Sequence, residues 1–440
     1  MQLATLGRAL VSGLVLSGLA TAGLANAPER SLRPVMRSVD AQGVQVAALV
    51  SVKPAVRPDV LTADIVPANA RFEAWIRSFK TRAARQGISK SVLDRSFRGV
   101  SYNADVVRRD RNQSEFTKTL WEYLDSAASD SRVKNGKAAL RKHAKTLNAI
   151  ERKYGVDKEV VVAVWGLESA YGAVRGDTPI IEALATLAFD GRRGKFFEAQ
   201  LIAALKILQN GDTVPRRMVG SWAGAMGHTQ FIPTSYLAFA VDFTGDGKRD
   251  IWSDDPSDAL ASTAAYLKKS GWKTGVPWGV EVTLPRGFNY ALANRKIKKM
   301  PSEWGALGVK DMSGKSVKNY GAASLLLPAG QRGAAFLIFR NFDAIERYNT
   351  ADAYVIGVGH LSDRIKGGGK IKARWPRDDR ALTFSERKEL QRRLTAAGFD
   401  TVKVDGKIGP LTIDAVRAYQ RSIGMEPDGY ASLAILKKLR

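Results

Sequence analysis

A single glutamate lies near the end of an almost wholly apolar segment. Residues 157–171 place Glu168 three residues from both Trp165 and Tyr171. Side chains three or four residues apart share one face of a helix, so apolar groups should surround this carboxyl group. Desolvation favours the protonated acid, which can protonate the leaving oxygen when a glycosidic bond breaks. The alternative for Glu168 is a structural ion pair with an arginine.

A second segment, residues 221–236, combines glycines with neutral polar side chains. Gly224 and Gly227 permit close approach of the backbone to a neighbour or ligand. Ser221 and Gln230 offer neutral hydrogen bonds suited to the hydroxyl and acetamido groups of sugars. This segment is therefore predicted to form the wall of a cleft.

Residues 165–172, 224–227 and 230–231 together resemble the lytic murein transglycosylase B family, and the resemblance continues in order through residues 341–349 and 354–361. The resemblance implies that Glu168 is the sole catalytic acid and base. It also implies a saccharide groove lined by Ser221, Gln230, Tyr348, Asn349 and Tyr354. Further contacts are expected from Arg192, Arg193, Tyr266 and Tyr123, with core packing as the alternative for Tyr123.

One carboxylate is enough for a lytic reaction on peptidoglycan. Glu168 would protonate the oxygen between MurNAc and GlcNAc and then accept the proton of the MurNAc 6-hydroxyl, which attacks C1 to form a 1,6-anhydro end. A hydrolase needs a second carboxylate. The alternatives are therefore a non-catalytic murein-binding scaffold, or a muramidase in which Glu168 is faced by Asp177, Glu182 or Asp190.

A candidate metal site follows the cleft segment. Asp242, Thr244, Asp246 and Asp250 occupy positions 1, 3, 5 and 9 of a calcium loop. Position 12, which should be a glutamate, is Ser253, and the displaced substitutes are Asp254, Asp255 and Asp258. A similar calcium loop belongs to the family that the chain resembles, so calcium is one expectation and a structural Asp-Gly turn is the other. No organic cofactor is expected.

The elements that must position these residues are mostly helical. Amphipathic spacing predicts helices within residues 72–85, 137–154 and 182–209. Strand-like pieces are short, at residues 280–284 and 334–339. The predicted fold is mainly α with a minor sheet, and the resemblance implies a lysozyme-like catalytic domain over residues 68–366.

A smaller module follows a predicted flexible linker at residues 367–381. Residues 382–440 begin with a capping box formed by Thr383 and Glu386 and contain Asp-Gly turns at 405–406 and 428–429. Three short helices are expected. The pattern of residues 404–412, 418–420 and 427–429 resembles the type 1 peptidoglycan-binding domain.

The first residues of the chain predict that these domains are exported from the cytoplasm. Residues 1–27 show an arginine, an apolar run and a small-residue cleavage site, which together predict a signal peptide, with an uncleaved anchor as the alternative. A flexible tether is expected at residues 28–67. The net charge of +25 favours anionic partners. We expect a periplasmic protein that binds peptidoglycan glycan strands and accompanies cell-wall synthesis machinery, with no nucleic-acid partner and no stable membrane span.

Overall fold

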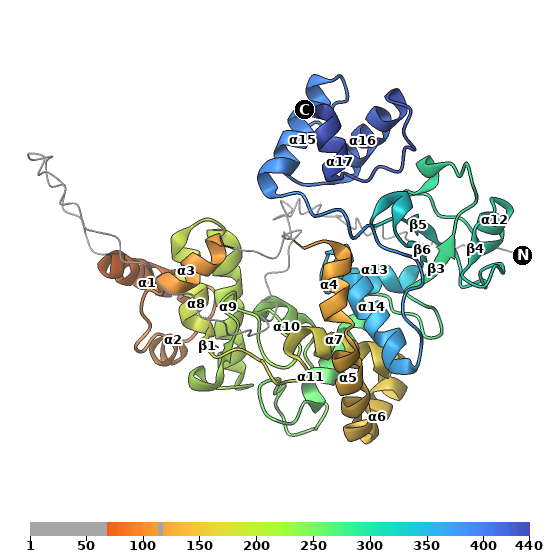
Figure 1. Cartoon of the computed structure of the whole chain (residues 1–440). Coiled ribbons are helices and arrows are strands. Elements are labelled where there is room, and N and C mark those ends of the chain that lie inside the picture. Colours follow the sequence, from red (N-terminus) through yellow and green to blue (C-terminus); the bar gives the residue numbers. More distant parts are fainter. Residues whose placement is uncertain (1–67, 113–117) are drawn as a thin grey trace, which may run out of the picture.

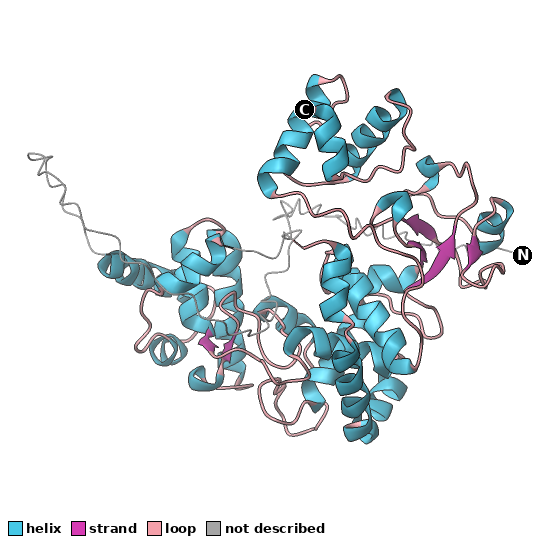
Figure 2. Cartoon of the chain, viewed as in Figure 1, coloured by secondary structure: helices cyan, strands magenta, loops and turns pink. Residues whose placement is uncertain are grey.

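The computed structural model describes residues 68–112 and 118–440, so the predicted signal peptide and tether lie outside the described residues. Helices dominate this part of the chain, and strands form two small antiparallel sheets (Figure 2). The predicted mainly α fold with a minor sheet is confirmed. Within the same residues, no helix has the length and apolar character that crossing a membrane requires.

One group of helices contains the first helix of the chain, whose aromatic side chains belong to the apolar core; Figure 1 shows these helices together. Phe72 and Phe79 are fully buried in it, which confirms the apolar face predicted for residues 72–85. The predicted helix at 182–209 is instead two helices, because Gly191 adopts a φ of 81° that ends the first of them. The group consists of α1 (Ala68–Arg85), α2 (Lys90–Ser96), α3 (Ala104–Arg111), α8 (Ile180–Asp190) and α9 (Gly194–Asn210).

A second group of helices surrounds α7 (Lys158–Ser169), whose residues 160–166 are all buried. α7 packs along α14 (Asp352–Lys366), and Figure 1 shows the two side by side. The predicted helix at 137–154 is divided at His143 into two helices. The remaining members are α4 (Leu120–Ala127), α5 (Asp130–Lys142), α6 (Ala144–Tyr154), α10 (Pro233–Phe239), α11 (Ser257–Lys269) and α13 (Arg340–Glu346).

The larger sheet has the strand order β4-β3-β6-β5 and is antiparallel throughout. Both predicted strands are confirmed, and Val280 of β3 lies opposite Leu337 of β6. A separate apolar core around Trp304 of α12 (Pro301–Ala306) covers this sheet. Its strands are β3 (Gly279–Thr283), β4 (Lys310–Asp311), β5 (Ser324–Leu326) and β6 (Ala335–Ile338), whereas β1 (Thr178–Pro179) pairs with β2 (Val219–Gly220) elsewhere.

The C-terminal module has three helices with their own apolar core. They are α15 (Phe384–Ala396), α16 (Pro410–Ser422) and α17 (Leu433–Leu439). The capping box of Thr383 and Glu386 is present as predicted. The module also contacts the rest of the chain, because Nη2 of Arg417 donates to the carbonyl of Ala293 at 2.6 Å.

The segment predicted as a flexible linker, residues 367–381, contacts the preceding domain. The N–H of Ala373 donates to the carboxylate of Glu281 at 2.7 Å. Arg377 binds both carboxylate oxygens of Asp125, at 2.8 and 2.9 Å. These contacts tie the segment to that domain, and its flexibility stays a prediction.

Candidate active site

Glu168 lies in the last turn of α7 and is only 9% exposed. The helix is anchored by its apolar residues, and its end is set by Ala170 and Tyr171, which adopt φ angles of 50° and 61°. Non-glycine residues rarely occupy this left-handed region, and clusters of such residues are typical of functional sites. The carboxyl group is therefore fixed on a rigid, buried element, as the sequence predicted.

Tyr354 is a polar partner of this carboxyl group. Its hydroxyl donates to Oε1 of Glu168 at 2.6 Å, from the first turn of α14. One turn later, Gly357 allows close packing, because a Cβ there would lie 2.8 Å from the ring of Tyr123 and 3.4 Å from Leu167. The structure thus brings Tyr354 into contact with Glu168, and places Tyr123, half-buried, over the same stretch of helix.

Aromatic side chains continue from Tyr354 away from the carboxylate. The rings of Tyr348 and Tyr354 are stacked with centroids 6.5 Å apart, and those of Tyr266 and Tyr348 are 4.9 Å apart. The hydroxyl of Tyr348 donates to the carbonyl of Thr229, and that of Tyr266 to the carbonyl of Arg347, each at 2.6 Å. Both predicted tyrosines therefore belong to one aromatic row that supports the glycine-rich segment.

The glycine-rich segment is a tight turn shaped by its own polar side chains. The hydroxyl of Ser221 accepts the N–H of Ala225 at 3.0 Å. Gln230, which has a φ of 53°, donates through Nε2 to the carbonyls of Arg175 and Gly227 at 2.9 and 2.8 Å. Much of the hydrogen-bonding capacity that the sequence assigned to sugar contacts is thus used inside the protein. Oε1 of Gln230 has no partner among residues 68–112 and 118–440.

The start of α14 is held by polar contacts that sequence reasoning did not find. Oδ1 of Asn349 accepts the N–H of Ala351 at 3.1 Å, so this predicted groove residue also shapes the turn into the helix. Arg295 donates to Glu346 at 2.5 Å and also pairs with Asp352. Because Arg295 is remote in sequence, no local pattern could have linked it to the site.

His228 ties the glycine-rich turn to the end of α7. Its Nδ1 accepts from Nε1 of Trp165 at 3.1 Å, its Nε2 donates to the carbonyl of Ser253 at 2.7 Å, and its own carbonyl accepts the hydroxyl of Ser169 at 2.5 Å. Burial lowers the pKa of His228, in keeping with a neutral ring in these roles. The signal was available, since His228 lies within the glycine-rich segment 221–236 and the chain has only three histidines.

The predicted contacts Arg192 and Arg193 lie in the turn between α8 and α9. Nε of Arg192 donates to Oδ2 of the buried Asp110 at 2.5 Å, which ties this turn to α3. The guanidinium of Arg193 lies over the ring of Phe196, 4.4 Å from its centroid. Both arginines therefore have structural partners in the first helical group, which the sequence did not predict.

Of the three carboxylates that could have served as the second acid of a muramidase, two have other partners and one is exposed. Oε1 of Glu182 accepts from Asn103 at 2.8 Å, and Asp190 pairs with Arg111 at 2.7 Å. Asp177 is exposed in the loop after α7. Glu182 and Asp190 are thus bound to the α3 region rather than positioned by contacts around α7.

The predicted calcium loop brings three carboxylates together. Asp242, Asp246 and Asp258 each have an oxygen within 4.8 Å of the others. Asp258, in the first turn of α11, supplies the acid missing at position 12, whereas the hydroxyl of Thr244 donates to Asp242 at 3.3 Å. Burial raises the pKa of Asp258, although backbone N–H groups of the loop oppose the shift. Carboxylate and hydroxyl oxygens are ligands that suit Ca²⁺.

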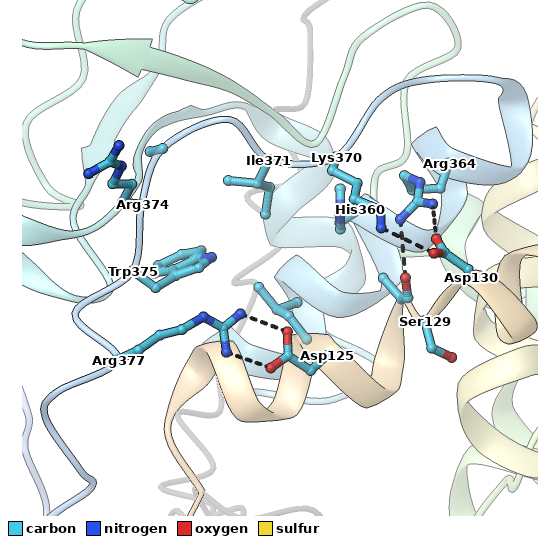
Figure 3. Close-up of a pocket in the computed structure, with 13 residues that line it drawn as sticks. Asp125, Ser129, Asp130, His360, Arg364, Lys370, Ile371, Arg374, Trp375 and Arg377 are labelled. Atoms are coloured by element: carbon cyan, nitrogen blue, oxygen red, sulfur yellow. Dashed lines mark hydrogen bonds and ion pairs between the residues drawn. The ribbon is translucent and has the colours of Figure 1, made fainter.

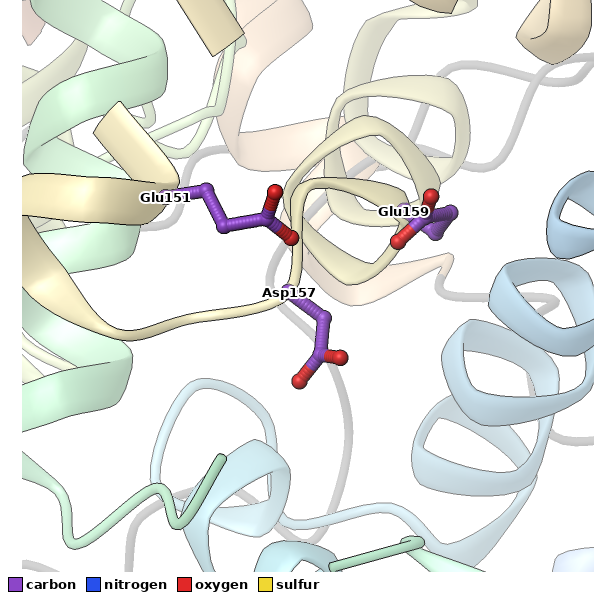
Figure 4. Close-up of side chains that lie close together, drawn as sticks. All are labelled: Glu151, Asp157 and Glu159. Atoms are coloured by element: carbon purple, nitrogen blue, oxygen red, sulfur yellow. The ribbon is translucent and has the colours of Figure 1, made fainter. Parts of the chain in front are cut away.

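A second acidic cluster surrounds the start of α7 (Figure 4). The cluster consists of Glu151, Asp157 and Glu159, and Asp157 stands at the N-cap position of α7 but makes no capping hydrogen bond through its side chain. Its Oδ2 instead accepts from Nε1 of Trp272 at 3.1 Å. Glu151 pairs with Lys158 at 3.0 Å. These carboxylates hold helices together and are not part of the Glu168 site.

Two family models match this chain, over most of its described length. The family described as "Transglycosylase SLT domain" matches residues 71–363, which contain Glu168, Tyr354 and the glycine-rich turn. The chain belongs to this transglycosylase family. A second family, described as "Putative peptidoglycan binding domain", matches residues 385–439. The recognised resemblance and the assignment to the lytic transglycosylases are thereby confirmed at the level of the family.

Named relatives agree with this assignment. SltB3 from Pseudomonas aeruginosa, solved with NAG-anhNAM-pentapeptide, has a TM-score of 0.82 and 51% identity over 84% of this chain and 99% of that one. Slt35 from Escherichia coli, solved with calcium, has a TM-score of 0.55 and 31% identity over 68% and 93% of the two chains. The membrane-bound lytic murein transglycosylase B of Escherichia coli K12 is 35% identical over 250 residues, 55% of this chain and 66% of that protein, just under two thirds of its length.

Proposed function

We propose that this transglycosylase cleaves the β-1,4 bond between MurNAc and GlcNAc in peptidoglycan and leaves 1,6-anhydro-MurNAc ends. The observation that carries the proposal is the buried carboxyl group of Glu168, held at 2.6 Å by the hydroxyl of Tyr354 within the family's motif. Glu168 acts as the single acid and base. Burial excludes water from this carboxyl group and so favours attack by the sugar's own hydroxyl.

The hydrogen bond from Tyr354 holds the carboxyl group of Glu168 in place for proton transfer. Oε1 accepts the hydrogen bond of the phenol, and the carboxyl group exchanges its proton with the sugar. Protonation of the glycosidic oxygen releases the leaving sugar, and the resulting carboxylate then takes the proton of the MurNAc 6-hydroxyl as that oxygen attacks C1. The phenol donates to the same oxygen in both steps and stabilises the ionised state.

Two observations support the lytic route over hydrolysis. Glu182 and Asp190, which could have served as the second carboxylate of a muramidase, are bound to Asn103 and Arg111. The relative SltB3 has been solved with a ligand that contains the anhydro sugar. A muramidase remains the alternative that the product analysis below tests.

The saccharide groove of this proposal follows the aromatic row and the glycine-rich turn. Oε1 of Gln230 accepts a hydrogen bond from a sugar hydroxyl or acetamido N–H, and the stacked rings of Tyr348 and Tyr354 form the aromatic part of the groove wall. Ser221 and Asn349 maintain the backbone around them. Tyr123 and Tyr266 complete the row at its two ends, and Arg192 and Arg193 line the more distant α8–α9 turn.

Calcium is proposed to bind at the loop of Asp242, Thr244 and Asp246, with Asp258 as the closing acid. The donor set fits the ion, because oxygens of three carboxylates lie within 4.8 Å of one another, and oxygen ligands are those that Ca²⁺ prefers. A bound ion would cross-link the loop to α11 and so stabilise the fold. It takes no part in the reaction.

The C-terminal module, residues 382–440, is proposed to hold glycan strands beside the catalytic domain. This assignment rests on the matched family at residues 385–439. Location in the periplasm follows from a peptidoglycan substrate together with the predicted export signal. Cooperation with cell-wall synthesis machinery stays a prediction.

The deciding experiment is mass spectrometry of purified peptidoglycan digested with the wild-type protein and with Glu168→Gln. Loss of general acid–base catalysis should lower the rate about 10²–10⁴-fold. Glu159→Gln is the matched control, since Glu159 is also a buried glutamate of α7 but lies in the other acidic cluster.

Products lighter by one water than reducing-end muropeptides, made by the wild type and Glu159→Gln but not by Glu168→Gln, would support the proposal. Reducing ends would instead establish a muramidase. A fully active Glu168→Gln variant would overturn the role of Glu168, and a wild type without products would point to a binding scaffold.

A further inference from the structure

A cavity of about 650 Å³ lies apart from the residues around Glu168. It is enclosed by α4, the turn into α5, α14 and the segment 370–377 that leads to the C-terminal module (Figure 3). Its volume lies in the range of cavities that hold small ligands. Nothing in the proposed reaction uses it.

The cavity carries an excess of positive charge. Its two carboxylates, Asp125 and Asp130, face four cationic side chains, namely Arg364, Lys370, Arg374 and Arg377. Arg377 binds Asp125 through both oxygens, and Arg364 and Lys370 share Asp130 at 2.7 and 3.1 Å (Figure 3). Arg374 has no hydrogen bond or ion pair with any described residue. Its guanidinium is therefore available to an anion.

His360 adds a buried polar group to the same cavity. It is only 8% exposed, lines the cavity, and makes no hydrogen bond with residues 68–112 or 118–440 (Figure 3). Burial, reinforced by Arg364, lowers its pKa to about 4, so the ring is neutral and offers one donor and one acceptor. Neither ring nitrogen is used within the described residues, so both are available to a ligand in the cavity.

Much of the remaining wall is apolar. It is formed by Leu124, Ala128, Ile371, Ala373 and Trp375. Such a wall suits a ligand with apolar side chains between its polar groups, and suits inorganic anions poorly. The combination of an arginine without a partner among the described residues, a neutral histidine and an apolar wall matches a short peptide that carries a carboxylate.

We propose that this cavity binds a carboxylate-bearing peptide of the class that peptidoglycan strands carry as stem peptides, with Arg374 on the carboxylate and His360 on a peptide amide. The proposal rests on peptidoglycan being the substrate. Arg374 forms charge-assisted hydrogen bonds to the carboxylate. Alanine-like side chains of the peptide contact Ile371 and Trp375.

The position of the cavity gives such binding two consequences. α14 carries both His360 and, six residues earlier, Tyr354, which holds Glu168. The opposite wall is the segment that leads to the C-terminal module. A bound peptide therefore fixes the substrate against both the catalytic helix and the path to the glycan-holding module, and should favour peptide-bearing strands over bare ones.

The test is isothermal titration of the full mature chain with a synthetic stem pentapeptide. Arg374→Ala should weaken binding about tenfold or more, because a charge-assisted hydrogen bond to the carboxylate is lost. Lys372→Ala is the matched control, since Lys372 is an exposed cation of the same segment that does not line the cavity. Two further probes are the same peptide with its carboxylates amidated, and inorganic phosphate.

Binding that is weakened by Arg374→Ala and by amidation, but not by Lys372→Ala, would support the site. No binding, an equal loss in Lys372→Ala, or phosphate binding as tightly as the peptide would overturn it. Cleavage of both kinds of strand is measured in parallel. In Arg374→Ala, cleavage of bare glycan strands is expected to be unchanged, whereas cleavage of peptide-bearing strands is expected to show a raised KM. Absence of cleavage of any strand by the wild type would refute the proposed reaction, whatever the titration shows.

Discussion

Replacing Tyr354 by phenylalanine removes one hydroxyl group from the contact at 2.6 Å with Oε1 of Glu168. The ring that stacks on Tyr348 is retained, so the variant should fold. A hydrogen bond to an ionised group contributes about 1.5–3 kcal/mol. Because the phenol donates to the carboxylate, it stabilises the ionised form more than the acid.

The expected result is a displaced pH–rate profile. At about 1.4 kcal/mol per pH unit, loss of this hydrogen bond should move the alkaline limb of kcat/KM to higher pH by about 1–2 units. The limb is the one on which Glu168 must still be protonated to act as an acid. Release of anhydro-muropeptides, followed by liquid chromatography and mass spectrometry from pH 4 to 9, measures the displacement.

The matched control is Tyr236→Phe, because the hydroxyl of Tyr236 donates to the backbone carbonyl of Arg249 at 2.5 Å. Loss of that bond should cost about 1 kcal/mol of stability and leave the profile in place. An alkaline limb within a few tenths of a unit of wild type in Tyr354→Phe, or an equal displacement in Tyr236→Phe, would refute the reasoning.

Three further predictions concern stability. Arg192→Ala should lower the free energy of unfolding by about 2–3 kcal/mol in urea titrations, because Asp110 is 1% exposed in its side chain and would lose its partner; a neutral result would show that Asp110 is rehydrated. The pKa of His360 is about 4 in the folded protein, against about 6.5 in the unfolded chain, so the folded protein binds fewer protons. The free energy of unfolding should therefore fall by up to about 3 kcal/mol as the pH drops from 6.5 to 4. The substitution His360→Asn should flatten this fall, and a pH dependence equal to that of the wild type would contradict the prediction. Calcium at 100 times its dissociation constant should raise the free energy of unfolding of the wild type by about 2.7 kcal/mol and that of Asp258→Asn much less. Equal shifts of the unfolding temperature in both proteins, measured by calorimetry, would place the ion elsewhere.

Local patterns in the sequence were sufficient for the elements and for the central residue of the site. The apolar segment around Glu168 predicted a buried helix, and α7 is one. The short strands and the capping box of Thr383 were also predicted correctly. Long amphipathic runs were predicted without their interruptions, because a turn such as that at Gly191 barely disturbs helical periodicity.

Contacts between distant segments could not be predicted in this way. Nothing local links Arg295 to α14 or Asp110 to Arg192. Asp157 had the residue type and position of a helix cap, yet its carboxylate bonds to Trp272 because tertiary packing offered that partner. Ser221 and Gln230 likewise turned out to bond within their own turn, which a list of polar residues cannot show.

The sequence by itself determined the helical class and the second module and singled out Glu168 as the candidate catalytic glutamate, since these depend on periodicity, capping and a specific motif. Only the tertiary structure decided that Tyr354 holds Glu168, that Asp258 lies beside Asp242 and Asp246, and that His360 and Arg374 share a cavity. The physical reason is that hydrogen bonds and charge pairing act over a few ångströms in space, and separations of up to 186 residues along the chain leave no local trace of them.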